Sequence, residues 1–104
     1  MIKVDVFYND SGDIYRFKVI NHGDPIVCAG VSALVITAVN FIQDRLKVSS
    51  KLDYKDSDYI DFEFETSKEA VLIAEHMLFG IEQIRDSYKN QIKIFTKKGD
   101  DSND

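Results

Sequence analysis

The sequence predicts a single α+β domain with a mostly antiparallel sheet and two helices. Three patterns predict this fold: two pairs of short segments with alternating apolar residues, two longer segments of helical periodicity, and a last alternating segment near the C-terminus. In chain order they give β-β-α-β-β-α-β. The 104 residues suffice for one hydrophobic core, and 44% hydrophobic and 30% charged residues are typical of soluble globular proteins.

The first two strands are predicted to form a hairpin. Apolar and polar residues alternate over residues 2–8, where Phe7 is the exception on the outer face. Residues 9–13 are typical of a turn, because Asn, Asp and Gly tolerate a left-handed backbone. The second strand covers residues 14–20. The side chains of Tyr15, Phe17 and Val19 are expected on one face of this strand, and those of Arg16 and Lys18 on the other.

The next segment predicts a helix from about Pro25 or Ile26 to about Lys47. Pro is favoured in a first turn because its missing N–H would be unpaired there, and Asp24 before it is a good N-cap. The segment is apolar almost all round, so we expect it to pack against the sheet and against a second copy of the chain. This predicts a homodimer. The apolar stretch is a little short for a bilayer span, and no membrane association is expected.

A second hairpin is predicted from residues 51–55 and 59–65 around the DSD turn. Its latter strand places three carboxylates on the outer side, those of Asp61, Glu63 and Glu65. The favoured interpretation is a solvated face. The functional alternative is a docking rim for a basic peptide.

The second helix is predicted to begin after Thr66. This residue is the expected N-cap, and Glu69 three residues later would complete a capping box. Residues 91–97 form the last predicted strand. The domain is therefore expected to span residues 1–97, followed by a polar, disordered tail over residues 98–104.

Composition restricts the compartment and the partners. One cysteine cannot form an internal disulfide and the first residues lack the apolar core of a signal peptide, so a cytoplasmic location is expected. The net charge is −5 and no stripe of Lys and Arg with interleaved aromatics occurs, so direct nucleic-acid binding is not expected. No phosphate-binding loop, dinucleotide fingerprint or metal-ligand spacing occurs, so neither a cofactor nor a metal site is predicted.

The cysteine, Cys28, lies in the first turn of the first predicted helix, six residues after His22. A helix N-terminus stabilises an anion such as a thiolate, and its N–H groups could hold an oxyanion. A turn can bring the imidazole of His22 to the sulfur, where it could take the thiol proton and later protonate a leaving amine. The alternative is an inert cysteine among apolar neighbours, which the spacing alone favours.

Other polar residues could support this pair. Ser32, one helical turn after Cys28, could donate a hydrogen bond near the site, although a serine within a helix more often bonds its own backbone. Asp24 could orient His22 as a third member, but the N-cap role is favoured. The second histidine, His76, is expected on the surface of the second helix, without partners at metal-ligand spacing.

The order of these parts resembles that of the bacterial ribosomal-processing cysteine proteases, Prp. The resemblance covers about residues 1–97 and is most specific in IVCAGVSAL, residues 26–34. It implies a cysteine endopeptidase that removes a short N-terminal extension from a large-subunit ribosomal protein, its peptide substrate. It also implies Cys28 as the nucleophile and His22 as the base, and it matches Ser32 to a family serine one turn after the nucleophile.

The chain departs from the family pattern around this pair. Asn21 stands where a glycine usually precedes the histidine, and Pro25 stands where an aspartate usually precedes the IVC motif. The loop between the histidine and the cysteine is several residues shorter and lacks the glycine-rich stretch. Two alternatives stay open: a non-catalytic binding protein of the same fold acting in ribosome assembly, and a single-thiol redox sensor. The residues expected to contact substrate are Asn21, Gly23 and Ala29.

Overall fold

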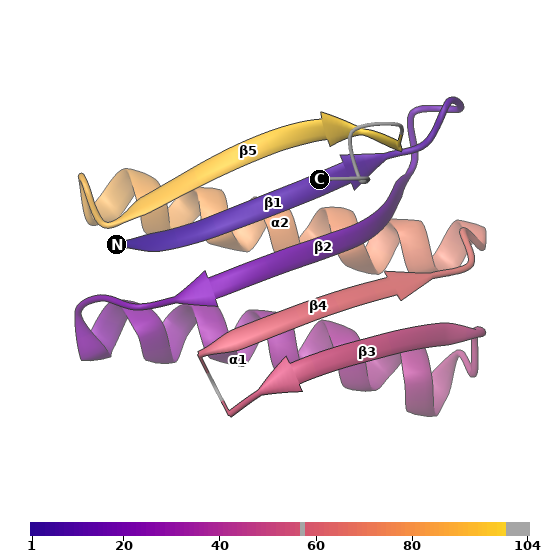
Figure 1. Cartoon of the computed structure of the whole chain (residues 1–104), viewed down its shortest axis with the longest axis horizontal. Coiled ribbons are helices and arrows are strands. Elements are labelled where there is room, and N and C mark those ends of the chain that lie inside the picture. Colours follow the sequence, from indigo (N-terminus) through magenta and orange to yellow (C-terminus); the bar gives the residue numbers. More distant parts are fainter. Residues whose placement is uncertain (57, 100–104) are drawn as a thin grey trace.

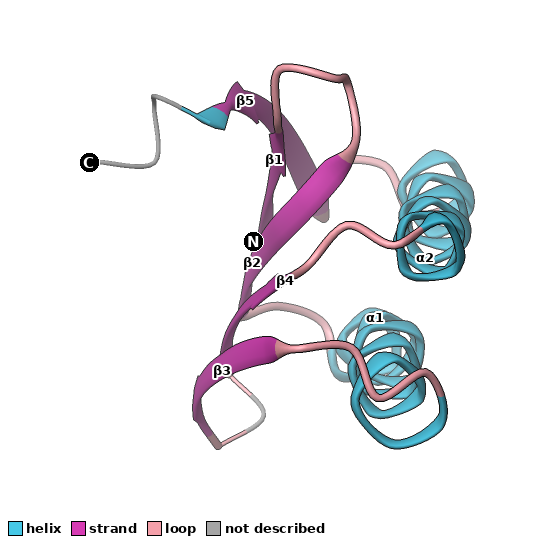
Figure 2. Ribbon diagram, turned by 90° about the vertical axis from the view of Figure 1, so that its right-hand side faces the viewer, coloured by secondary structure: helices cyan, strands magenta, loops and turns pink. Residues whose placement is uncertain are grey.

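The computed structural model describes residues 1–56 and 58–99. A five-stranded sheet carries both helices on one face (Figures 1 and 2). The elements follow the predicted order β-β-α-β-β-α-β, which confirms the α+β fold class. They are β1 (Ile2–Tyr8), β2 (Ile14–Asn21), α1 (Pro25–Asn40), β3 (Ser50–Lys55), β4 (Tyr59–Phe64), α2 (Lys68–Ser87) and β5 (Ile92–Lys98).

The strand order in the sheet is β3-β4-β2-β1-β5. β5 pairs with β1 in parallel and the other three pairings are antiparallel, as the predicted mostly antiparallel sheet requires. The end of β2 is joined to the start of β4 by a hydrogen bond from the Asn21 N–H to the Asp58 carbonyl oxygen, 2.8 Å long. β5 includes Lys98, one residue beyond the predicted strand. Within the predicted tail, residues 100–104 lie outside the described residues.

The hydrophobic core lies between the sheet and the helix layer. Small residues allow α1 and α2 to pack closely side by side (Figure 2). A Cβ at Gly80 would lie 2.8 Å from Leu34 Cδ1, and a Cβ at Gly30 would lie 3.1 Å from Ile84 Cδ1. The fully buried side chains include Ile2, Val4, Val6, Phe17, Val31, Phe62 and Ile81.

The prediction that Tyr15 shares a face with Phe17 and Val19 is wrong. The pairing of β1 with β2 shifts register, so that Phe7 opposes Arg16 while the next residue of β1 opposes Ile14. Ile14 therefore takes the buried position, and Tyr15 packs edge-on against the buried outer-face ring of Phe7, with 6.4 Å between ring centroids. A bulge of this kind reverses the alternation that a regular strand would keep. The Tyr15 hydroxyl donates a hydrogen bond to the Gly99 carbonyl oxygen at 3.3 Å.

Both predicted helices differ from the structure at one end. α1 continues into a π-helical turn, Phe41–Arg45, and ends two residues before the predicted Lys47. α2 is capped by Ser67, whose Oγ accepts the Ala70 N–H at 3.1 Å. The predicted cap at Thr66 is therefore wrong by one residue, and Glu69 does not complete a capping box.

The segment Pro25–Arg45 is long and apolar enough to cross a membrane by length and composition alone. The core helix of a soluble protein meets the same criterion, and here a third of the apolar window is buried inside the protein. Val27, Val31 and Val35 are the residues of this helix that point most directly into the core. The absence of membrane association stays a prediction.

Candidate active site

The loop after β2 positions Cys28 in the first turn of α1. The helix begins at Pro25, and the Asp24 carboxylate accepts the N–H groups of Ile26 at 2.9 Å and Val27 at 3.3 Å. These bonds confirm the predicted helix start and N-cap. The thiol of Cys28 is half-buried, and it is the one free cysteine of the described chain.

The N–H groups of this helix start are already occupied. Pro25 has none, those of Ile26 and Val27 donate to the Asp24 carboxylate, and that of Cys28 donates to the Asp24 carbonyl oxygen at 2.8 Å. The prediction that they would hold an oxyanion is therefore wrong for this conformation. By contrast, no hydrogen bond in the described part of the chain involves the N–H of Gly23.

A cavity of about 350 Å³ brings the two predicted catalytic residues together. Every predicted site residue except Asp24 contributes to its lining. The lining residues are Asn21, His22, Gly23, Pro25, Cys28, Ala29, Ser32 and Asp58. Asp58 carries no sequence signal for this site, because it arrives through the pairing of β4 with β2.

Asn21 links the end of β2 to the first turns of α1. Its side chain is buried, with the residue only 7% exposed. Nδ2 donates to the Cys28 carbonyl oxygen at 3.2 Å and to Ser32 Oγ at 2.7 Å, while Oδ1 has no partner among the described residues. A glycine at this place could make neither side-chain bond. The side-chain amide of Asn21 points into the protein. The predicted contact of Asn21 with substrate stays a prediction.

The thiol of Cys28 lies against the peptide bond that precedes His22. Its Sγ is 3.8 Å from the Asn21 carbonyl oxygen, to which it donates a weak hydrogen bond. The imidazole of His22 is exposed on the same cavity and makes no hydrogen bond to Cys28 or Asp24 in the described chain. Catalytic hydrogen bonds often tighten only when substrate is bound. His22 and Cys28 therefore line the same cavity without a hydrogen bond between them.

Other predicted features lie away from this cavity. His76 is exposed on α2, as expected. Of the acidic side chains on β4, Asp61 forms a two-pronged ion pair with Arg16 at 2.7 and 2.9 Å, which raises the pKa of that guanidinium. Glu63 and Glu65 stay exposed. No group of three or more His, Cys, Asp or Glu that could hold a metal ion occurs in residues 1–56 and 58–99.

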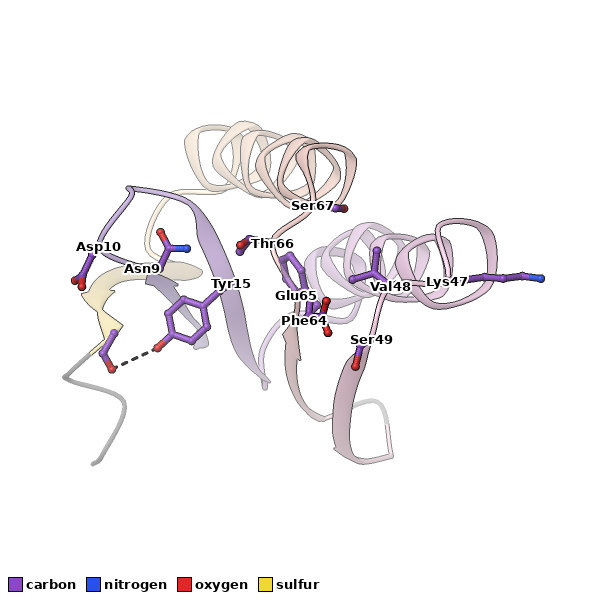
Figure 3. Close-up of a pocket in the computed structure, with 11 residues that line it drawn as sticks. Asn9, Asp10, Tyr15, Lys47, Val48, Ser49, Phe64, Glu65, Thr66 and Ser67 are labelled. Atoms are coloured by element: carbon purple, nitrogen blue, oxygen red, sulfur yellow. Dashed lines mark hydrogen bonds between the residues drawn. The ribbon is translucent and has the colours of Figure 1, made fainter.

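A larger cavity of about 900 Å³ lies at the opposite end of β2 (Figure 3). Tyr15 lines one side of it, and Phe64, Glu65 and Ser67 line another. Its lining contains neither a cysteine nor a histidine. Of these two cavities, the one at Cys28 is the cavity that contains a thiol.

Comparison with known proteins shows which family shares this arrangement. The family model described as Cysteine protease Prp matches residues 1–93. The chain belongs to the Prp cysteine protease family. The match confirms the resemblance found in the sequence and identifies the chain as a cysteine protease.

Two relatives of the family illustrate the similarity. The chain is 35% identical over 82 residues to the ribosomal processing cysteine protease Prp of Bacillus subtilis, covering 72% of this chain and 73% of the relative. It is 30% identical over 103 residues to the protein of the same description from Staphylococcus aureus (strain Mu50), covering 90% and 97% respectively.

Solved structures share the fold over most of the chain. One is the Prp ribosomal processing protease of S. aureus in complex with a covalently linked product peptide, with a TM-score of 0.86 and 30% identity. Another is that protease in complex with a substrate peptide, with a TM-score of 0.85 and 28% identity. Each comparison covers 93% of this chain and 100% of the other.

Proposed function

We propose that this protease removes the N-terminal extension of a bacterial large-subunit ribosomal protein, using Cys28 as nucleophile and His22 as general base and acid. The observation that carries the proposal is that both residues line one cavity at the start of α1. The relatives described as ribosomal processing cysteine proteases support a ribosomal substrate. The product peptide linked covalently to the S. aureus protease supports a peptide as that substrate.

In the proposed mechanism, the imidazole of His22 takes the proton from the thiol of Cys28. The thiolate forms a bond to the scissile carbonyl carbon, and the carbonyl electron pair moves to its oxygen. When this intermediate collapses, the C–N bond breaks and the imidazolium gives its proton to the leaving amine. A water molecule, deprotonated by His22, then adds to the thioester, and collapse releases the carboxyl product and the thiol.

The N–H of Gly23 is the donor that we assign to the oxyanion in this mechanism. It belongs to a residue that lines the cavity, and it makes no hydrogen bond among the described residues. The N–H groups at the start of α1 are engaged by Asp24. A donor aimed at the developing charge in a protected site is a large contribution to catalysis.

We also propose that the protease acts as a homodimer through the outer face of its helix layer. Both helices cover the same side of the sheet (Figure 2), and both carry large apolar residues that are exposed to solvent. Ile26 is 71%, Leu72 63% and Phe79 61% exposed. Exposed apolar side chains concentrated on one layer are typical of an interaction surface, and a second copy presents the matching one.

The proposed location is the bacterial cytoplasm, where the ribosomal substrate is made. The protease is proposed to recognise the peptide segment alone, without contact with nucleic acid. Mass spectrometry of the extended ribosomal protein after incubation with this chain tests the proposal. The expected result is one defined N-terminal truncation with the wild type and none with Cys28→Ala. An intact substrate after incubation with folded wild-type protein would refute it.

A further inference from the structure

A third, mainly apolar cavity of about 390 Å³ lies further along α1. Ile36 and Val39 contribute to it from α1, while Leu52, Tyr54 and Ile60 contribute from β3 and β4. In Figure 1, α1 lies behind these two strands. We call this cavity the α1–β4 groove. The mechanism at Cys28 does not use it.

The α1–β4 groove continues the line of the catalytic cavity. Cys28 and Ser32 line the catalytic cavity and Ile36 lines the groove, and these residues recur every four positions on one side of α1. The wall opposite α1 is continuous in the same way, because Asp58 lines the catalytic cavity and Ile60 lines the groove. An extended chain lying at Cys28 can therefore follow α1 into the groove.

We propose that the α1–β4 groove is the substrate subsite for a large apolar side chain three or four residues from the scissile bond. This inference rests on the proposed function. From Cys28 to Ile36, α1 advances eight residues, or about 12 Å along its axis. An extended peptide advances about 3.3 Å per residue, so three to four residues cover this distance.

The surface of the groove fits such an occupant. Ile36 is 42% and Tyr54 62% exposed, so large apolar groups face solvent in a concave site. A substrate side chain would remove this surface from water. Asp56 lines the groove and Asp58 lines the catalytic cavity, both with exposed residues, so the rim favours a peptide with positive charges over an acidic one.

A double-mutant cycle between enzyme and peptide tests the subsite. The peptides are synthetic copies of the ribosomal extension and its following residues, in which each large apolar residue is replaced in turn by serine. The enzymes are the wild type, Ile36→Glu and the control Thr37→Glu. Thr37 is the adjacent exposed residue of α1 and does not line the groove. The measurements are kcat/KM for each pair and the oligomeric state of each variant.

One peptide position should depend on the groove. With the wild type and Thr37→Glu, serine at the third or fourth residue from the scissile bond lowers kcat/KM by about 10- to 100-fold. With Ile36→Glu, the unsubstituted peptide loses a similar factor and the serine has no further effect. Equal serine effects in all three enzymes would overturn the subsite. So would a loss with Ile36→Glu that follows from dissociation of a dimer, because the groove would then be covered by a second copy.

Binding to the Cys28→Ala variant separates this inference from the proposed function. If the wild type cuts none of the peptides, the proposed function fails, but their affinities for Cys28→Ala still test the groove. Weaker binding on adding Ile36→Glu, and not on adding Thr37→Glu, would support the subsite. Unchanged binding would reject it.

Discussion

The Nδ2 atom of Asn21 lies 2.7 Å from Ser32 Oγ, so the end of β2 is bonded directly to the second turn of α1. The same amide nitrogen donates to the Cys28 carbonyl oxygen. Both bonds are in a buried place, where losing a partner leaves polar atoms unpaired. We therefore expect Asn21 to position Cys28, the proposed nucleophile.

Replacing Asn21 by alanine should destabilise the protein by about 1–3 kcal/mol, because Ser32 Oγ and the Cys28 carbonyl oxygen lose their donor. Urea unfolding measures this change as a difference in the free energy of unfolding. Ser32→Ala should cost less, since the amide keeps one bond, and the double variant should be less destabilised than the sum. Wild-type stability in Asn21→Ala would contradict the positioning role.

The Asp24 carboxylate stabilises the start of α1, and it also places a negative charge near the thiol of Cys28. Asp24→Asn keeps a good N-cap and removes that charge, so alkylation of Cys28 by iodoacetamide at pH 7 should become faster with little change in stability. Asp24→Ala should lose about 1 kcal/mol of stability. An unchanged alkylation rate in Asp24→Asn would show that the carboxylate does not influence the thiol.

The N–H of Gly23 can be removed with a matched control. Gly23→Ala should keep activity, because the added Cβ would lie no closer than 3.6 Å to Gln91 Oε1 and Ile2 Cγ1. Gly23→Pro lacks the N–H and should lower kcat by about 100- to 1,000-fold. Iodoacetamide alkylation of Cys28 needs no oxyanion donor and should continue in both variants. Equal cleavage by the two variants would exclude Gly23 as the donor.

The proposed dimer should dissociate when charge enters the outer face of the helix layer. Phe79→Glu, alone or with Leu72→Glu, is expected to give a monomer by light scattering after size-exclusion chromatography. Tyr54→Glu is a matched control, because this exposed aromatic residue lies on β3, away from the outer helix face. A monomeric wild type, or a dimer that survives both changes, would contradict the proposed interface.

Local patterns predicted much of the site, and long-range pairing explains most of the rest. Pro25 and Asp24 act within a few residues of each other, so the helix start that carries Cys28 follows from sequence alone. Tyr15 was misplaced because a bulge depends on the partner strand. Asp58 could not be assigned because it reaches the cavity through strand pairing between segments far apart in the chain.

The oxyanion site expected at the start of α1 conflicts with a local feature of the sequence. An N-cap carboxylate takes the first N–H groups of a helix, so the predicted cap at Asp24 already argued against an oxyanion site at those groups. By contrast, the hydrogen bonds from Asn21 to Cys28 and Ser32 could not be predicted from the sequence. They depend on the angle at which α1 leaves β2, which packing of the whole helix layer determines.

Alkylation of Cys28 by iodoacetamide in the folded protein, followed by mass spectrometry across pH, tests the His22–Cys28 pair most directly. We predict rapid modification at pH 7, slowed by about tenfold in His22→Ala, since the thiolate is the reacting form. His76→Ala, which removes the exposed histidine of α2, should react like the wild type. Equal rates with and without His22, or reaction only in denaturant, would contradict the account.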